Sequence, residues 1–207
     1  MKLFLSSQAI SKEQAPYFLD LVAKPAKSIR LAVIENAADV ETGSKAWLLR
    51  NRHMIESHGF EVEYVDVRKY AQDVEALRAK FAAKDVLWFG GGNTFYLRWL
   101  LRNTGVERIV KELVHAGTVY GGGSAGAIIA GPTLHFFEAA DEPQASPGIV
   151  YEGFSFTNKV VVPHIDNKKY APIIHEVNDK LKADGYQTVP LADAQALVID
   201  GTSEKVV

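Results

Sequence analysis

Residues 122–126 read Gly-Gly-Ser-Ala-Gly and place Ser124 between two glycines, each two positions away. The apolar run 118–120 precedes them and the apolar run 127–130 follows, which predicts a strand, a sharp turn and a helix. Such a turn strains the serine backbone and projects its Oγ from the carboxyl end of a sheet. Because the first amides of the helix would face the group under attack, Ser124 is a candidate nucleophile. A glycine-rich turn that binds phosphate would give a similar pattern.

Three consecutive glycines follow a second apolar run. Residues 85–89 predict a buried strand, residues 90–92 are all glycine, and Asn93 is suited to cap the predicted helix that follows. No side chains cover the amides of these glycines. Two of these amides, or one of them together with the amide of Ala125, could bracket an oxyanion. A tight strand-to-helix turn without a ligand is the alternative.

His164 follows the apolar run 160–162 and Pro163, at the carboxyl end of a predicted strand. A general base for a serine must take the hydroxyl proton across a hydrogen bond and return it to the leaving group. None of the other histidines is expected at a strand end. His135, in the irregular stretch 133–157, is the rival base, and a capping or core role is the alternative for His164.

A base of this kind needs a carboxylate to fix its tautomer. Asp193 lies in the turn before the predicted strand 196–199 and is the preferred candidate. Asp166 is too close to His164 along an extended chain to approach the ring, and Asp200 belongs to an Asp-Gly turn.

The composition limits the class of protein. A chain of 207 residues with 47% hydrophobic and 23% charged residues is typical of one globular domain, here residues 1–207. The net charge of −2 without a polybasic stretch argues against nucleic acid binding. No signal peptide or long apolar stretch is present, so we expect a cytoplasmic protein without membrane contact. Since cysteine is absent and the six histidines lack ligand spacing, we expect no metal and no cofactor.

Short apolar runs alternate with helical patterns along the chain. This alternation is typical of an α/β fold, a three-layer sandwich with a mostly parallel sheet covered on both faces. Ligands bind such sheets beyond the carboxyl ends of the strands. The predicted strands span residues 2–6, 30–34, 61–67, 85–89, 118–121, 159–163 and 196–199, with 204–207 as a hairpin partner, and the helices span about 12–23, 43–58, 71–83, 93–103, 105–116 and 168–184.

The predicted helix 43–58 is amphipathic, because its apolar side chains recur after seven residues and stack on one face. The face expected to be buried carries Trp47, Leu48, Met54 and Ile55, and the face expected in water carries Arg50, Arg52 and Glu56.

Three segments together resemble the peptidase E (aspartyl dipeptidase) family of serine peptidases, of which cyanophycinases are more distant relatives. They are residues 89–95 (Phe-Gly-Gly-Gly-Asn-Thr-Phe), residues 122–127 (Gly-Gly-Ser-Ala-Gly-Ala) and Pro163-His164. The likeness runs over nearly the whole chain. It implies a flavodoxin-like fold similar to that of class I glutamine amidotransferases, with serine in place of their cysteine.

The resemblance also implies a catalytic triad in the chain order serine, histidine, acid. Ser124 would be the nucleophile, His164 the base and Asp193 the acid, with the amides of Gly91 and Ala125 holding the oxyanion. This order differs from that of α/β-hydrolases, in which the acid precedes the histidine.

One departure from the family concerns specificity. Members specific for an N-terminal aspartate carry an arginine some dozen residues beyond the triad histidine, where it can hold a carboxylate with two hydrogen bonds. No arginine follows His164 here, and Lys168 or Lys169 could pair with a carboxylate only with poorer geometry. Gly92 and Asn93 are further candidate substrate contacts, and Glu138, Asp141 or Glu142 could accept a substrate's α-ammonium, as the family's loop acid would, or simply be solvated charges.

We therefore predict a serine peptidase that hydrolyses short peptides through an acyl-enzyme, with the preference for an N-terminal aspartate left open. The expected partner is a short peptide, and the expected state is a monomer or homodimer. An esterase or amidase with the same triad is one alternative. A non-catalytic homologue that binds a small molecule at residues 90–92 is the other.

Overall fold

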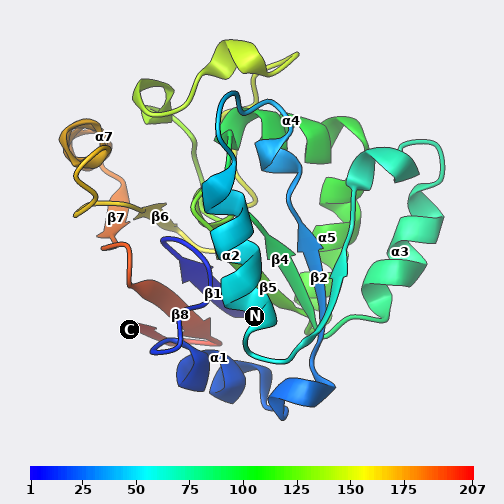
Figure 1. The fold of residues 1–207 in the computed structure, drawn as a ribbon. Helices are drawn as coiled ribbons and strands as arrows, with labels where there is room; N and C mark the ends of the chain where they lie inside the picture. Colours follow the sequence, from blue (N-terminus) through cyan, green and yellow to red (C-terminus); the bar gives the residue numbers. More distant parts are fainter.

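A seven-stranded sheet forms the centre of the protein (Figure 1). The structure is a computed structural model that describes residues 1–207. The strands of this sheet are β1 (Lys2–Ser6), β2 (Arg30–Ile34), β3 (Glu61–Tyr64), β4 (Val86–Phe89), β5 (Val119–Gly123), β8 (Ala196–Asp200) and β9 (Ser203–Val206). Their order is β3-β2-β4-β5-β1-β8-β9, in which the first five are parallel and the last two run antiparallel to their neighbours.

Helices cover both faces of the sheet, as the burial of their side chains shows. Two helices, α1 (Ala15–Val22) and α2 (Ala46–Glu56), contribute to the core on one face. The opposite core is built with α3 (Val74–Ala82), α4 (Thr94–Asn103), α5 (Val106–His115), α6 (Ala125–Ile128) and α7 (Ala171–Ala183). The predicted α/β fold with a mostly parallel, doubly covered sheet is confirmed.

The central strands are apolar on both sides because successive side chains enter different cores. Leu3 and Leu5 of β1 belong to the larger core, and Phe4 between them belongs to the smaller one. The same alternation runs along β2, where Leu31 and Ala32 point to opposite cores. This double burial explains the near-continuous apolar runs of the sequence.

Helix α2 is much less deeply packed than α4. Of the apolar side chains predicted to share its buried face, only Ile55 is buried. In α4, by contrast, seven side chains are buried, including Arg98. Helix α2 therefore lies over the sheet with most of its surface turned to solvent or to cavities.

Strand β6 (Lys159–Val162) lies outside the main sheet. It pairs in parallel with β7 (Gln187–Pro190), a strand that the sequence did not predict because it begins with polar residues and ends in proline. The other predicted strands and helices are present, with ends within three residues of the prediction. The predicted hairpin across Asp200 and Gly201 is formed by β8 and β9.

Candidate active site

Ser124 occupies a strained turn between β5 and α6. Its φ of 51° and ψ of −111° lie in a region that side-chain-bearing residues rarely adopt. A Cβ on Gly122 would lie 2.4 Å from the carbonyl carbon of Gly126, and a Cβ on Gly126 would lie 2.0 Å from the carbonyl oxygen of Phe89. Both glycines of the sequence motif are therefore required by close backbone contacts.

His164 lies between Ser124 and Asp193. Its Nε2 is 3.0 Å from the Oγ of Ser124, and its Nδ1 is 2.6 Å from the Oδ1 of Asp193. Since an ionised carboxylate can only accept hydrogen bonds, Nδ1 carries the proton and donates a hydrogen bond to Asp193. Nε2 is then free to accept the hydroxyl proton of Ser124, which is the geometry of a general base.

The end of β1 holds the three segments that carry these side chains. The carbonyl of Ser6 accepts a hydrogen bond from the Ser124 amide at 3.1 Å, and the Ser7 amide donates at 3.0 Å to the carbonyl of Gln195, in the turn of Asp193. The Ser7 Oγ accepts a hydrogen bond from the His164 amide at 2.9 Å. Ser6 and Ser7 are fully buried.

The hydrogen bond to Ser7 holds a strained backbone in place. His164 has a φ of 65°, in the left-handed region that costs a residue with a side chain about 1 kcal/mol or more. The buried hydroxyl of Ser7 binds the amide of this strained residue and so fixes the start of its side chain.

Asp193 is held by two further hydrogen bonds. Its Oδ2 accepts from the Nδ2 of Asn167 at 2.7 Å, and its amide donates to the Oδ1 of Asp166 at 2.8 Å. Burial alone would raise the pKa of Asp193, but hydrogen bonds from His164 and Asn167 outweigh it and hold the pKa below its ordinary value. Asp193 is therefore ionised at neutral pH, and Asp166 fixes the backbone of Asp193 rather than the imidazole.

Two free amides adjoin the Ser124 hydroxyl. Neither the amide of Gly91 nor that of Ala125 donates a hydrogen bond within the protein. A Cβ on Gly91 would lie 3.8 Å from the Oγ of Ser124, so the Gly91 backbone passes next to the hydroxyl. Free amides beside a serine hydroxyl can stabilise negative charge that develops on an attacked carbonyl.

Ser124 and His164 open into a cavity of about 620 Å³, a size typical of small-molecule sites. Of the candidate substrate contacts, Gly92, Asn93 and Asp141 line it, as do Glu142 and Lys169.

Glu138 and Lys168 do not line the cavity, and neither does His135. The ring of His135 instead stacks on Tyr151, with 4.2 Å between the ring centroids.

Asp141 is tied to the start of α4. Its Oδ2 accepts the Thr94 amide at 2.9 Å, next to Asn93, whose Oδ1 caps the helix by accepting the Tyr96 amide at 2.9 Å. Burial raises the pKa of Asp141 above its ordinary value, although the hydrogen bond from Thr94 acts in the opposite direction. The carboxylate thus pays a desolvation cost that a cationic ligand would relieve.

Part of the cavity wall, formed by residues 40–51, was not predicted from the sequence. Its charged and aromatic members are Glu41, Trp47 and Arg50. Their only signal was the spacing of Trp47, Arg50 and Asn51, which places the three on one helical face. That face lines the cavity.

The fold and this side-chain arrangement are those of a serine-type hydrolase: a serine in a strand-to-helix turn, hydrogen-bonded to an imidazole that a carboxylate orients. Comparison with known proteins identifies the family. Residues 3–207 match Peptidase family S51, so the chain belongs to this family and is a serine-type peptidase. The resemblance to peptidase E seen in the sequence is confirmed.

Individual relatives are moderately similar. The chain is 28% identical over 163 residues to the uncharacterized peptidase Lmo0363 of Listeria monocytogenes, covering 78% of this chain and 74% of that protein. It is 33% identical over 104 residues to the uncharacterized peptidase YgaJ of Bacillus subtilis, covering 49% of this chain and 43% of that protein.

The fold also matches solved structures. A protein of Listeria monocytogenes EGD-e, provisionally named peptidase E, superposes with a TM-score of 0.86 at 24% identity, covering 100% of this chain and 97% of the other. A peptidase from an acI-B1 Actinobacterium gives a TM-score of 0.73 at 22% identity, covering 100% of this chain and 86% of the other.

No group of three or more His, Asp or Glu side chains is arranged to hold a metal ion. No helix is both long and apolar enough to cross a membrane.

Proposed function

We propose that this protein hydrolyses short peptides with Ser124 as nucleophile, His164 as general base and Asp193 as the orienting acid. The observation that carries the proposal is the position of His164, 3.0 Å from the Ser124 hydroxyl and 2.6 Å from the Asp193 carboxylate. No other histidine of the chain lines the cavity.

The reaction has two halves. His164 takes the proton of Ser124 as its Oγ attacks the scissile carbonyl, and the amides of Gly91 and Ala125 stabilise the oxyanion. The protonated imidazole, stabilised by Asp193, then gives its proton to the leaving amine, and an acyl-enzyme remains. Water, deprotonated by His164, releases the acid product and restores the serine.

The substrate is a dipeptide or similarly short peptide with a free amino terminus. Asp141 supports this choice, because it is an acid in the cavity wall whose pKa is raised by burial and whose cost of ionisation an α-ammonium group would lower. The cavity volume of about 620 Å³ is suited to a small peptide rather than to a folded protein.

The test combines covalent labelling with substrate screening. A fluorophosphonate should label the native protein at Ser124, and a dipeptide library with mass-spectrometric readout should yield cleaved members. The matched control is Ser124→Ala, which should fold and neither label nor cleave. Labelling without any peptide cleavage, together with turnover of p-nitrophenyl esters, would replace the peptidase by an esterase, and absence of both reactions would refute a catalytic serine.

A further inference from the structure

Arg50 differs from every other arginine of the chain in its ion pairing. The sequence contains eight arginines, and the other seven all form an ion pair with a carboxylate. Arg50 forms none, and its side chain makes no hydrogen bond within the protein. Arg50 lies on α2 and is exposed, so its guanidinium group is free to bind a partner.

The free arginine lies in the wall of the cavity that contains Ser124. Trp47, Arg50 and Asn51 occupy positions i, i+3 and i+4 of α2 and therefore share the face that lines the cavity. The half-buried Trp47 adds a rigid aromatic surface to the same cavity wall. A small ligand bound at Ser124 is therefore enclosed by the same cavity as Arg50.

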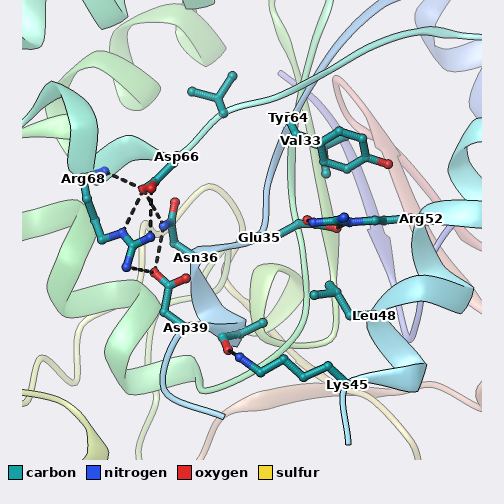
Figure 2. A pocket seen from close by; sticks show the side chains of 12 residues that line it. Val33, Glu35, Asn36, Asp39, Lys45, Leu48, Arg52, Tyr64, Asp66 and Arg68 are labelled. Carbon is teal, nitrogen blue, oxygen red and sulfur yellow. Dashed lines mark hydrogen bonds and ion pairs between the residues drawn. The ribbon is translucent and has the colours of Figure 1, made fainter.

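On the opposite side of α2, the arginines form ion pairs with carboxylates of the protein. Figure 2 shows a second pocket, of about 220 Å³, lined by Leu48 and Arg52 of α2. There Arg52 lies 2.5 Å from Glu35, and Arg68 lies 2.8 Å from Asp66. The guanidinium groups of this pocket are therefore neutralised by carboxylates of the protein itself.

The Ser124 cavity instead contains unpaired charges of both signs, which suits a ligand that carries both an anionic and a cationic group. Its acids, Glu41, Asp141 and Glu142, form no ion pair, and burial together with the charges of Asp141 and Glu142 raises the pKa of Glu41. Lys169 lies over the ring of Tyr170 and donates a hydrogen bond to its hydroxyl at 3.1 Å. Arg50 is thus the cation of this cavity that has no partner of any kind.

We propose that Arg50 binds a carboxylate group of the peptide substrate, whose ammonium group is received by the acids of the same cavity. The planar guanidinium group can hold both oxygens of a carboxylate, which a lysine cannot do. The carboxylate has two sources, the C-terminus of a dipeptide or an acidic side chain. This inference rests on the proposed peptide substrate, and α2 supplies the specificity residue.

The experiment measures binding without catalysis. Calorimetry on Ser124→Ala uses Asp-Leu, Asn-Leu and the C-terminal amides of both, and is repeated on Ser124→Ala carrying Arg50→Ala, Arg50→Lys or Lys27→Ala. Lys27 is an exposed, unpaired cation near the amino end of β2, whereas the cavity lies at the carboxyl ends of β4 and β5, so it serves as the charge-matched control. Thermal unfolding checks that each variant folds.

We expect Arg50→Ala to weaken binding by about tenfold or more for the peptides that carry the carboxylate bound by Arg50. Arg50→Lys should weaken their binding less. Lys27→Ala should leave binding unchanged. A loss that disappears with Asn in place of Asp assigns the side chain, and one that disappears with the amides assigns the C-terminus.

Equal affinities in the presence and absence of Arg50, an equal loss for all four peptides, or no binding of any peptide would overturn the inference. Labelling and hydrolysis by the native protein test the proposed function separately, because neither depends on these affinities.

Discussion

The two cavities on either side of α2 differ in whether their charged side chains form ion pairs. In the pocket of Figure 2, Arg52 and Arg68 are neutralised by carboxylates of the same pocket. In the cavity of Ser124, the acidic side chains, Arg50 and Lys169 form no ion pair, and His164 binds Asp193 as a neutral imidazole that donates a hydrogen bond. The charges of the pocket therefore stabilise the fold, whereas those of the cavity have no ion-pair partner within the protein. Substitutions in the cavity should therefore change catalysis, and substitutions in the pocket should change stability.

The largest effect is expected from Asp193→Asn. The NH2 group of the asparagine can donate a hydrogen bond to Nδ1 and so favour the wrong imidazole tautomer, and the neutral amide stabilises no imidazolium, so kcat should fall by about 10⁴, as for other triad acids. Steady-state kinetics on a cleaved dipeptide measures this fall. Asp166→Asn is the neighbouring control, because the Asp166 carboxylate accepts a hydrogen bond from the Asp193 amide and none from the imidazole. A loss below about tenfold for Asp193→Asn would assign the orienting role to another acid.

A smaller loss is expected from Ser7→Ala. Without the hydroxyl, the amide of His164 loses its acceptor, and a misplaced base should lower kcat between about tenfold and a hundredfold with little change in KM. Ser6→Ala is the matched control, because its buried hydroxyl contacts the carbonyl of Ala9 rather than His164. If both variants lose stability and kcat equally, Ser7 supports the fold and does not position the base.

Ser7 also marks the limit of what the sequence could reveal about the site. The strand-turn-helix at Ser124 and the histidine after β6 leave local signals, since their backbone geometry depends on neighbouring residues. The hydrogen bond from the His164 amide to Ser7 joins positions 157 residues apart, and no local pattern encodes it. The same holds for Arg50, whose role depends on where the whole of α2 lies over the sheet.

The fold was more predictable than the site because its determinants repeat along the chain. Apolar runs buried on both faces identified the strands of the parallel sheet, and helical periodicity identified the helices. β7 was missed because its neighbours in space, rather than its own polar sequence, make it a strand. The buried face of α2 was predicted from periodicity, but cavities on both sides of this helix leave only Ile55 buried.

Asp141→Asn should separate binding from stability within the cavity. Because burial raises the pKa of Asp141, ionising this carboxyl group costs more free energy in the folded protein than in the unfolded chain. Removing the charge should therefore raise the melting temperature at neutral pH. The asparagine oxygen can still accept the Thr94 amide. The same change should raise KM about tenfold for peptides with a free amino terminus and leave N-acetylated peptides unaffected. Equal losses for both peptide types would remove Asp141 from the ammonium site.

Asp66→Asn should produce the opposite result in the pocket of Figure 2. Hydrogen bonds from Arg68 lower the pKa of Asp66 to about 2 from an ordinary value of 3.8. Because the folded pKa is the lower one, the carboxylate stabilises the fold above pH 3.8, and this contribution is lost as the pH falls through about 2. Since Arg68 is half exposed, solvent screening should limit the loss in the asparagine variant to about 1 kcal/mol at neutral pH.

Urea unfolding of native protein and variant, between neutral pH and about pH 2, measures this difference. The two stabilities should converge below pH 3.8, because protons bind Asp66 first in the unfolded chain and then in the folded protein, and the asparagine has no charge to lose. Both kcat and KM should be unchanged, since Asp66 does not line the cavity of Ser124. A large loss of kcat without a loss of stability would contradict the division between the two cavities, and would mean that the pocket charges act on catalysis through α2.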